Sequence, residues 1–203
     1  MPQQERGERR VNELLKAAAE VIAETGYEAA TMSAIAERAG ACIGSLYQFF
    51  PNKLFITQSL RAHYTRAIQE MWEPLALEAK TIPLSRLVDR LVNSMIHFVE
   101  SNPALLPLLD APRSTRSPIA IRNLIREQVA QLILAKDPRM NREKAVTIAK
   151  VILQMLRALN ELYAESNSKQ RRVLIQEFKI ALHCYLASRM ASGRAERTRS
   201  SER

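Results

Sequence analysis

The chain has 203 residues, a formal net charge of +9 and 47% hydrophobic residues, which suits one medium-sized domain or two small ones sharing a core. Two cysteines at unrelated positions predict no disulfide framework and a reducing compartment. The polar start after Met1 has no apolar segment of a signal peptide, and no apolar run is long enough to span a membrane. We therefore expect a soluble, cytoplasmic protein with no membrane partner.

Glycine is scarce while leucine, alanine, glutamate and arginine are abundant, so the predicted fold class is all-α. The first helix is expected from about Glu8 to Thr25. Its inner face is predicted to consist of Val11, Leu14, Leu15, Ala18 and Ile22.

The sequence of residues 31–53 predicts two short helices joined by a turn. Apolar residues at helical spacing give the first helix one buried side, and Gly40 supplies the residue that turns left-handed and closes it. Leu46 and Phe50, four residues apart in the second helix, point into a small core. Such a pair of helices is the scaffold that lays its second helix in the major groove of DNA. An ordinary helical hairpin within a bundle is the alternative that periodicity leaves open.

The residues left on the outer side of this hairpin suit contact with DNA. Gly44 lowers helix stability by roughly 1 kcal/mol relative to alanine, so its bare backbone indicates a close approach of phosphates or base edges. Tyr47 carries a hydroxyl suited to a phosphate, and Ile43 suits a thymine methyl group. The predicted DNA-binding residues are Thr31, Ser33, Ile43, Gly44, Ser45, Tyr47, Gln48 and Lys53.

Lys53 is predicted to bind an anion. Asn52 is a good N-cap for the next helix, which puts Lys53 in its first turn, where a cation opposes the helix dipole. A phosphate at that helix start would explain the residue. A solvated lysine is the alternative.

A family resemblance rests on these same residues. The pattern reads Thr31-x-x-x-Ile35-Ala36-x-x-Ala39-Gly40, then Gly44-Ser45-Leu46-Tyr47-x-x-Phe50-Pro51-x-Lys53. It resembles the N-terminal domain of TetR-family transcriptional regulators over roughly residues 10 to 55, and Gly26-Tyr27 is similar to the turn that follows the family's first helix. The resemblance implies an all-α homodimer with a helix-turn-helix at one end and a ligand cavity at the other. Ligand binding in such proteins usually releases DNA.

Two positions depart from the family pattern. Cys42 stands where serine is common, and Ile43 stands where lysine or another polar residue is frequent. The family's base preference therefore does not transfer to this chain. Cys42 at a helix start also admits a redox role, but its only possible partner is Cys184 in a different predicted helix. A small residue in the turn is the preferred interpretation.

The positive charge is unevenly distributed. Residues 1–53 hold six Lys/Arg against seven acids, a net charge of −1, so the basic excess lies in residues 54–203. Arg6, Arg9 and Arg10 form an arm that could contact the DNA backbone. The Arg/Ser-rich end of the chain is predicted to be a disordered basic tail.

The rest of the chain is predicted to be helical. A long helix begins at Lys53 and carries Leu60, Tyr64, Ile68 and Met71 on one side, and Pro74 should end or kink it. Further helices are expected near residues 84–100, 118–136, 142–164 and 169–190. Pro103, Pro107 and Pro112 are expected to divide their segment into short turns.

The last two helices predict a homodimer. Residues 142–164 have a broad apolar arc, and the final helix has two apolar stripes on opposite sides. One stripe is Leu174, Phe178, Leu182 and Tyr185, and the other is Val173, Ile180, Cys184 and Ala187. Such helices suit packing on their own core and on a partner, in a four-helix interface. A central helix of a monomer is the alternative.

Polar and large side chains among apolar ones suggest a ligand cavity, although each is also compatible with a plain core. The predicted ligand-binding residues are Met71, Trp72, Met95, Phe98, Asn160 and Tyr163. His97 shares its face with arginines and is interpreted as solvated.

Three isolated histidines and the absence of metal, nucleophile or phosphate-loop motifs predict no enzyme, no cofactor and no metal. The predicted domains are a DNA-binding domain at 1–53, a ligand-binding and dimerisation domain at 54–190, and the tail at 191–203. The predicted function is a ligand-responsive transcriptional repressor that a small apolar effector releases from a palindromic operator. The alternative is a helical ligand-binding or adaptor protein without specific DNA binding.

Overall fold

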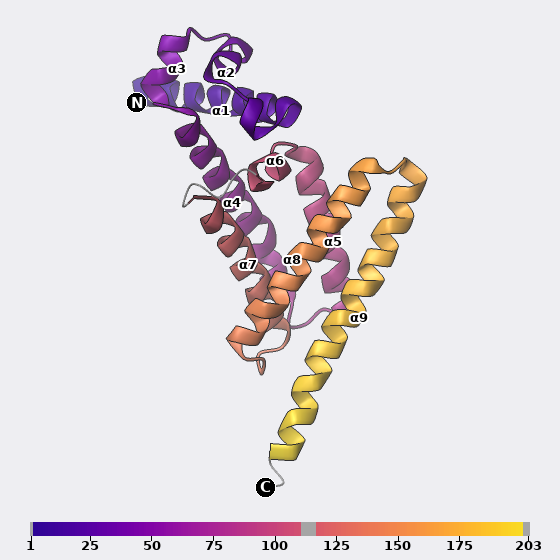
Figure 1. Cartoon of the computed structure of the whole chain (residues 1–203). Coiled ribbons are helices and arrows are strands. Elements are labelled where there is room, and N and C mark those ends of the chain that lie inside the picture. Colours follow the sequence, from indigo (N-terminus) through magenta and orange to yellow (C-terminus); the bar gives the residue numbers. More distant parts are fainter. Residues whose placement is uncertain (1, 111–116, 201–203) are drawn as a thin grey trace. The chain divides into compact units, whose positions relative to one another are not determined.

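The computed structural model describes residues 2–110 and 117–200, and its regular secondary structure there is entirely helical, which confirms the all-α fold class (Figure 1). The helices are α1 (Pro2–Ala29), α2 (Met32–Arg38), α3 (Ile43–Phe49), α4 (Lys53–Glu78), α5 (Leu84–Ser101), α6 (Leu105–Asp110), α7 (Ser117–Lys136), α8 (Arg142–Glu165) and α9 (Ser168–Ser200). None of these helices combines the length and hydropathy needed to cross a membrane.

The chain forms two compact units. The first comprises Met1–Ala67 and Phe98–Asn123, and the second comprises Ile68–His97 and Leu124–Arg203. Helices α4 and α5 therefore each contribute residues to both units. The first unit contains the predicted 1–53 domain and adds the beginning of α4 together with α6.

In the first unit, α2 packs against α1 and α3 packs against α2 (Figure 1). On the predicted inner face of α1, Leu14, Ala18 and Ile22 are fully buried, whereas Val11 and Leu15 are half-buried. Helix α1 is interrupted near its end by Gly26, whose φ of 79° lies in the left-handed region that favours glycine. The chain therefore turns at the predicted Gly26-Tyr27 position.

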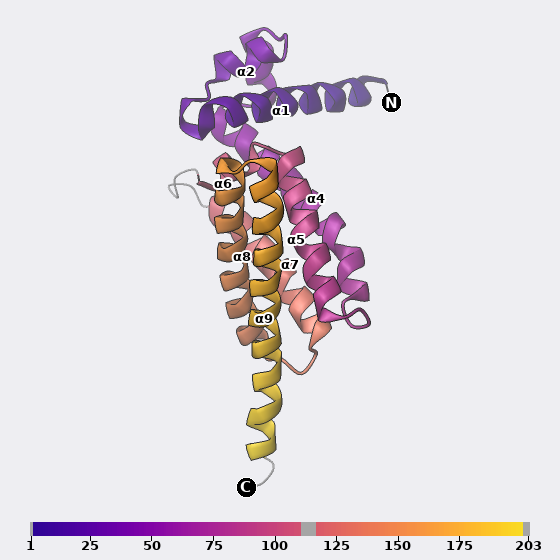
Figure 2. The ribbon, with the colours of Figure 1, turned by 90° about the vertical axis from the view of Figure 1, so that its right-hand side faces the viewer.

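In the second unit, α8 and α9 run side by side in opposite directions (Figures 1 and 2). Each helix buries one apolar side. The buried side chains include Ile148, Ile152, Leu156 and Leu159 of α8 and Leu182 and Leu186 of α9.

The structure bears on three of the predictions, two about prolines and one about the tail. Pro74 was expected to end or kink its helix, and it does not end α4, which continues to Glu78; Pro74 is exposed, so the carbonyl group that loses its partner there is left to solvent. Pro107 lies in the first turn of α6 rather than in an irregular turn, because the first N–H groups of a helix have no intrahelical partner. Helix α9 extends to Ser200, into the predicted disordered tail, since alanine, arginine and glutamate favour helices. Pro112 and residues 201–203 lie outside the described residues.

Candidate DNA-binding surface

The turn between α2 and α3 is fixed by backbone bonds. The Thr31 hydroxyl caps α2 by accepting a bond from the backbone N–H of Ala34 at 3.2 Å. Gly40, with φ of 57°, closes the helix, and its N–H and that of Ala41 donate to carbonyl groups of the last turn at 3.0 and 2.9 Å. These two bonds form a Schellman motif, which supports the predicted role of Gly40.

Helix α3 has a buried back and an exposed front. Leu46 is 0% exposed and Phe50 is 5% exposed, so the predicted inward residues are confirmed. On the other side, Ile43 and Tyr47 are 41% and 48% exposed, and Gln48 is exposed beside them. The predicted DNA-binding residues of α3 therefore share one accessible surface, with Ser45 half-buried at its edge.

Gly44 lies on this exposed front of α3. A Cβ atom added there would meet no protein atom within 4 Å, and the residue has ordinary helical backbone. Neither the packing of this chain nor its backbone conformation requires glycine at that position. A partner that approaches α3 from outside gives the residue a physical reason.

Two further predicted contacts lie at the start of α2. Thr31 and Ser33 are exposed at the start of α2. Cys42 is the N-cap of α3 and forms no side-chain cap bond.

A bidentate ion pair joins α2 to α1. The Arg38 guanidinium donates to both carboxylate oxygens of Glu24 at 2.8 and 2.6 Å, and lies 3.5 Å from Glu20. The hydrogen bond from Arg38 lowers the pKa of Glu24 below its ordinary value, and the same pair raises the pKa of Arg38. All three side chains are exposed, so water screens this ion pair and its contribution to the stability of the fold is small.

Lys53 has partners within the chain. Asn52 caps α4 as predicted, because its side-chain oxygen accepts bonds from the N–H groups of Leu54 and Phe55. The Lys53 ammonium donates to the carbonyl oxygens of Tyr27 and Glu28 at 2.8 and 3.0 Å. It also lies 4.6 Å from the centre of the Tyr27 ring. The predicted phosphate contact of Lys53 stays a prediction.

Arg61 was not identified from the sequence. It is 3% exposed, its guanidinium lies 5.9 Å from the centre of the Tyr27 ring, and it donates to the carbonyl oxygen of Leu108 at 2.9 Å. A helical wheel of α4 could have identified the residue, because Thr57, Arg61 and Thr65 form a buried polar stripe beside the predicted apolar one.

The predicted ligand-binding residues fall into separate surroundings. Trp72 is 1% exposed and donates its indole N–H to the Ser94 hydroxyl at 3.0 Å, next to the buried Met95 on α5. Asn160 is buried in α8. Met71 is half-buried.

The other two predicted ligand-binding residues have partners of their own. Phe98 belongs to the first unit, where it meets the ring of Tyr64 edge-on. Burial raises the pKa of Tyr64. Tyr163 lies near the end of α8, where its ring and carbonyl oxygen contact Arg171.

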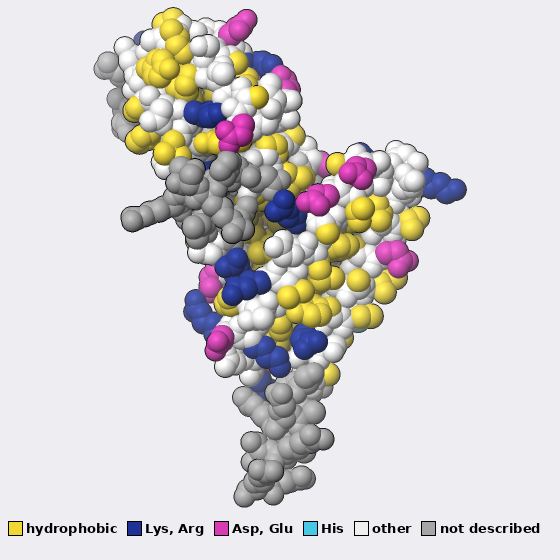
Figure 3. All heavy atoms as spheres, viewed as in Figure 1, with side chains coloured by type: hydrophobic (Ala, Val, Ile, Leu, Met, Phe, Trp, Pro, Cys, Tyr) yellow, Lys and Arg dark blue, Asp and Glu magenta, His cyan; other side chains and the backbone are white. Residues whose placement is uncertain are grey.

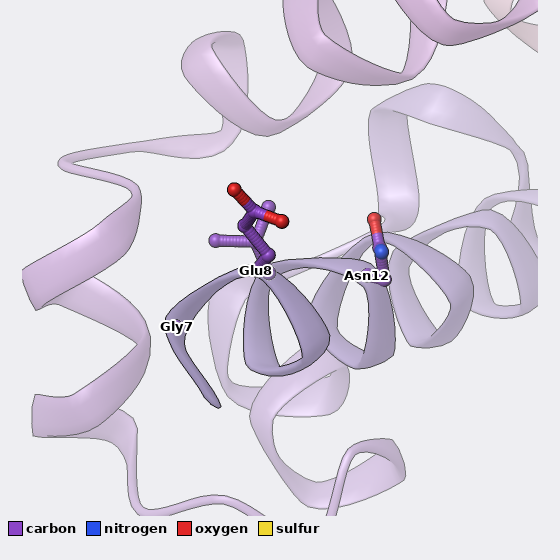
Figure 4. Close-up of a pocket in the computed structure, with 4 residues that line it drawn as sticks. Gly7, Glu8 and Asn12 are labelled. Atoms are coloured by element: carbon purple, nitrogen blue, oxygen red, sulfur yellow. The ribbon is translucent and has the colours of Figure 1, made fainter. Parts of the chain in front are cut away.

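A shallow hollow of about 540 Å³ lies beside the first turns of α1. It is lined by Gly7, Glu8, Val11 and Asn12, all from α1 (Figure 4). Figure 4 shows the Glu8 and Asn12 side chains on the same side of the helix. One carboxylate and one amide on a single helix do not indicate a particular ligand.

A second exposed surface covers α8 and α9. Val151 and Leu162 of α8 are 40% and 48% exposed, and Val173 and Ile180 of α9 are 58% and 57% exposed. We call these four residues the α8–α9 apolar face. Figure 3 shows apolar side chains gathered over the two helices. The two predicted apolar stripes of the last helix differ in burial, because Leu182 of one stripe is fully buried while Ile180 of the other is exposed.

Comparison with known families finds two matches within the chain. The family described as bacterial regulatory proteins, tetR family, matches residues 14–56. The domain described as tetracyclin repressor-like, C-terminal domain, matches residues 83–186, which is more than half of the chain.

Individual relatives agree with these matches. The HTH-type transcriptional repressor KstR of Mycolicibacterium smegmatis is 33% identical over 92 residues, which is 45% of this chain and 44% of KstR. The matched stretch thus spans less than half of that relative. A putative TetR-family regulator from Mesorhizobium loti has a TM-score of 0.71 at 19% identity, covering 90% of this chain and 98% of that one. The fatty acid degradation regulator FadR from Bacillus halodurans has a TM-score of 0.65 at 17% identity, covering 87% and 94%.

Proposed function

Because the chain belongs to the TetR family of bacterial regulatory proteins, we propose that it is a transcriptional repressor that a small apolar effector releases from a palindromic operator. The family consists of transcriptional regulators, so the prediction that the chain is not an enzyme is confirmed. The observation that carries the proposal is the front of α3, where Ile43, Tyr47 and Gln48 are exposed around a glycine that no internal packing requires.

The proposed DNA contacts follow from the chemistry of this surface. Tyr47 donates its hydroxyl to a phosphate, Gln48 bonds a base edge, and Ile43 packs on a thymine methyl group. Gly44 lets the DNA backbone approach α3. The proposed set is Thr31, Ser33, Ile43, Gly44, Ser45, Tyr47 and Gln48.

The direction of regulation is proposed from the relatives. The KstR proteins of two mycobacterial species are both named transcriptional repressors, and they are 33% and 31% identical to this chain over 92 residues. A repressor of this kind meets its operator in the cytoplasm, which is where we assign the protein.

The proposed assembly is a homodimer through the α8–α9 apolar face. Two copies that bring these faces together form a four-helix interface in which the exposed aliphatic side chains leave water. A two-fold axis then relates the two α3 helices, so the operator should contain two inverted half-sites about 34 Å apart or somewhat more.

The proposed effector site lies in the second unit, which holds Trp72, Met95 and Asn160. An effector changes DNA affinity only if it binds the two conformations of the protein unequally. Trp72 is the single tryptophan of the chain, so its fluorescence reports this region alone. We expect anilinonaphthalene sulfonate, an apolar probe, to receive energy from Trp72 and to lose that signal in Trp72→Phe. A probe that binds without energy transfer would contradict the assigned region.

The proposal is tested by selecting duplexes from a random DNA pool with the purified protein. We expect an inverted repeat, bound by two copies and retained against random competitor across a salt series. Weak binding that is equal on all sequences and steeply salt-dependent would contradict it. That result would favour a helical ligand-binding or adaptor protein.

A further inference from the structure

The ammonium group of Lys53 is surrounded by acceptors from its own chain. It lies 2.8 Å from the carbonyl oxygen of Tyr27, 3.0 Å from that of Glu28, and 4.6 Å from the centre of the Tyr27 ring. A lysine ammonium has three N–H donors. Two carbonyl oxygens and one ring face therefore provide a partner for each of the three N–H groups without a phosphate.

These contacts also compensate an unfavourable position. Lys53 begins α4, where the helix dipole opposes a positive charge. The carbonyl groups of Tyr27 and Glu28 lie after the interruption of α1 at Gly26, in the last residues of the element, where carbonyl groups lack helical partners. The ammonium thus joins the end of α1 to the beginning of α4.

A second cation acts on the same ring. Arg61 lies 5.9 Å from the centre of the Tyr27 ring and donates to the carbonyl oxygen of Leu108 in α6. Tyr27, Lys53 and Arg61 belong to the first unit and connect three of its helices. We call these three residues the Tyr27 clamp.

We propose that the Tyr27 clamp fixes the end of α1, after Gly26, to α4 and α6, so that Lys53 supports DNA binding as a positioning residue and not as a phosphate ligand. The clamped carbonyl groups lie only a few residues before Thr31, which caps α2. The direction of α2, and of α3 after it, therefore depends on this segment. The inference rests on the proposed function, since it concerns how the α3 surface is presented to an operator.

The test measures operator affinity and its salt dependence in Lys53→Met, Tyr27→Leu and the double variant. The probe is the duplex that the wild-type protein selects from a random pool. We expect each single change to weaken binding about tenfold through the lost cation–π contact and hydrogen bonds. The slope of log K against log salt should stay at the wild-type value in both, and the double variant should bind about as well as either single one.

Tyr27→Phe is the matched control, because it keeps the ring and should bind like the wild type. If Lys53 contacts a phosphate, the slope of log K against log salt should be smaller by about 0.9 in Lys53→Met. The losses of operator affinity of the two single variants should then multiply in the double variant. Either result overturns the inference. Helical circular dichroism of each variant shows whether it folds. If Tyr27→Leu does not fold, the slope of Lys53→Met decides alone.

A wild-type protein that selects no duplex would overturn the proposed function, and this inference with it. A selected duplex with a reduced slope in Lys53→Met overturns only the inference.

Discussion

The front of α3 and the α8–α9 apolar face both expose large apolar side chains, but they differ in the kind of side chain that they expose. On α3, Ile43 and Tyr47 stand beside a bare glycine and an amide. On α8 and α9 the large exposed side chains are aliphatic, such as Val173 and Ile180. Exposed apolar area alone therefore does not identify a partner. A glycine and an amide beside the apolar side chains suit the grooves of DNA, whereas aliphatic side chains exposed on two neighbouring helices suit another protein.

The largest expected effect is the loss of the dimer, which tests the α8–α9 apolar face without changing the front of α3. Ile180→Glu should dissociate the homodimer, because the interface would bury an unpaired carboxylate at roughly 3–5 kcal/mol. Operator affinity should fall on the order of a hundredfold or more, since one copy holds only one half-site. Light scattering with size exclusion and DNA titration measure both. Leu77→Glu in α4, where the side chain is 80% exposed, is the control that should remain dimeric. A dimer that persists in Ile180→Glu contradicts the proposed interface.

Tyr47→Ala should act on DNA binding and leave the dimer intact. Loss of a hydroxyl bonded to a phosphate should weaken operator binding roughly 10- to 100-fold. The side chain is 48% exposed, so the free energy of unfolding should change by no more than about 0.5 kcal/mol. Tyr47→Phe keeps the ring and separates the hydroxyl from the apolar contact. Unchanged DNA affinity in Tyr47→Ala would show that the front of α3 is not the DNA-binding surface.

Gly44→Ala should move stability and binding in opposite directions. The added methyl group meets no atom of the chain, so helix propensity should stabilise α3 by up to about 1 kcal/mol. The same methyl group should hinder DNA and weaken operator binding several-fold. Thermal unfolding and DNA titration test both. Gly7→Ala, in α1, where an added Cβ also meets nothing, is the control for propensity. Tighter or equal DNA binding in Gly44→Ala would remove the reason proposed for the glycine.

The smallest effect concerns the ion pair between Arg38 of α2 and Glu24 of α1. The pKa of Glu24 is lowered below 4.5 in the folded state, so the fold prefers its ionised form. The stabilisation is therefore present above pH 4.5 and is lost as the pH falls through the lower folded pKa. Glu24→Gln should slightly lower the thermal midpoint at neutral pH and reduce its decrease below pH 4.5. A variant whose midpoint falls with acid as steeply as the wild type would assign that dependence to other groups.

Much of the proposed DNA-binding region could be predicted from the sequence because its signals are local. Gly40 marks the turn, and the spacing of Leu46 and Phe50 distinguishes the back of α3 from its front. Those relations extend over a few residues, within the period of one helix.

The surroundings of Lys53 and Arg61 could not be predicted in this way. Lys53 bonds carbonyl groups 26 and 25 residues earlier, and Arg61 bonds one 47 residues later. Helical periodicity carries no information about partners at such separations. The sequence predicted an anion beside Lys53 because a cation at a helix start opposes the helix dipole. In the structure, carbonyl groups at the end of α1 contact the ammonium group instead.

The sequence by itself determined the all-α class, the helix-turn-helix with its outward residues, and the two apolar stripes of the last helix, because each follows from short-range periodicity and turn chemistry. Only the tertiary structure decided which stripe of α9 is buried and which is exposed. It also decided that α6 forms around Pro107 and that Lys53 and Arg61 meet at Tyr27. The physical reason is the same in each case: these outcomes depend on which distant segments of the chain pack together, and no local pattern encodes that choice.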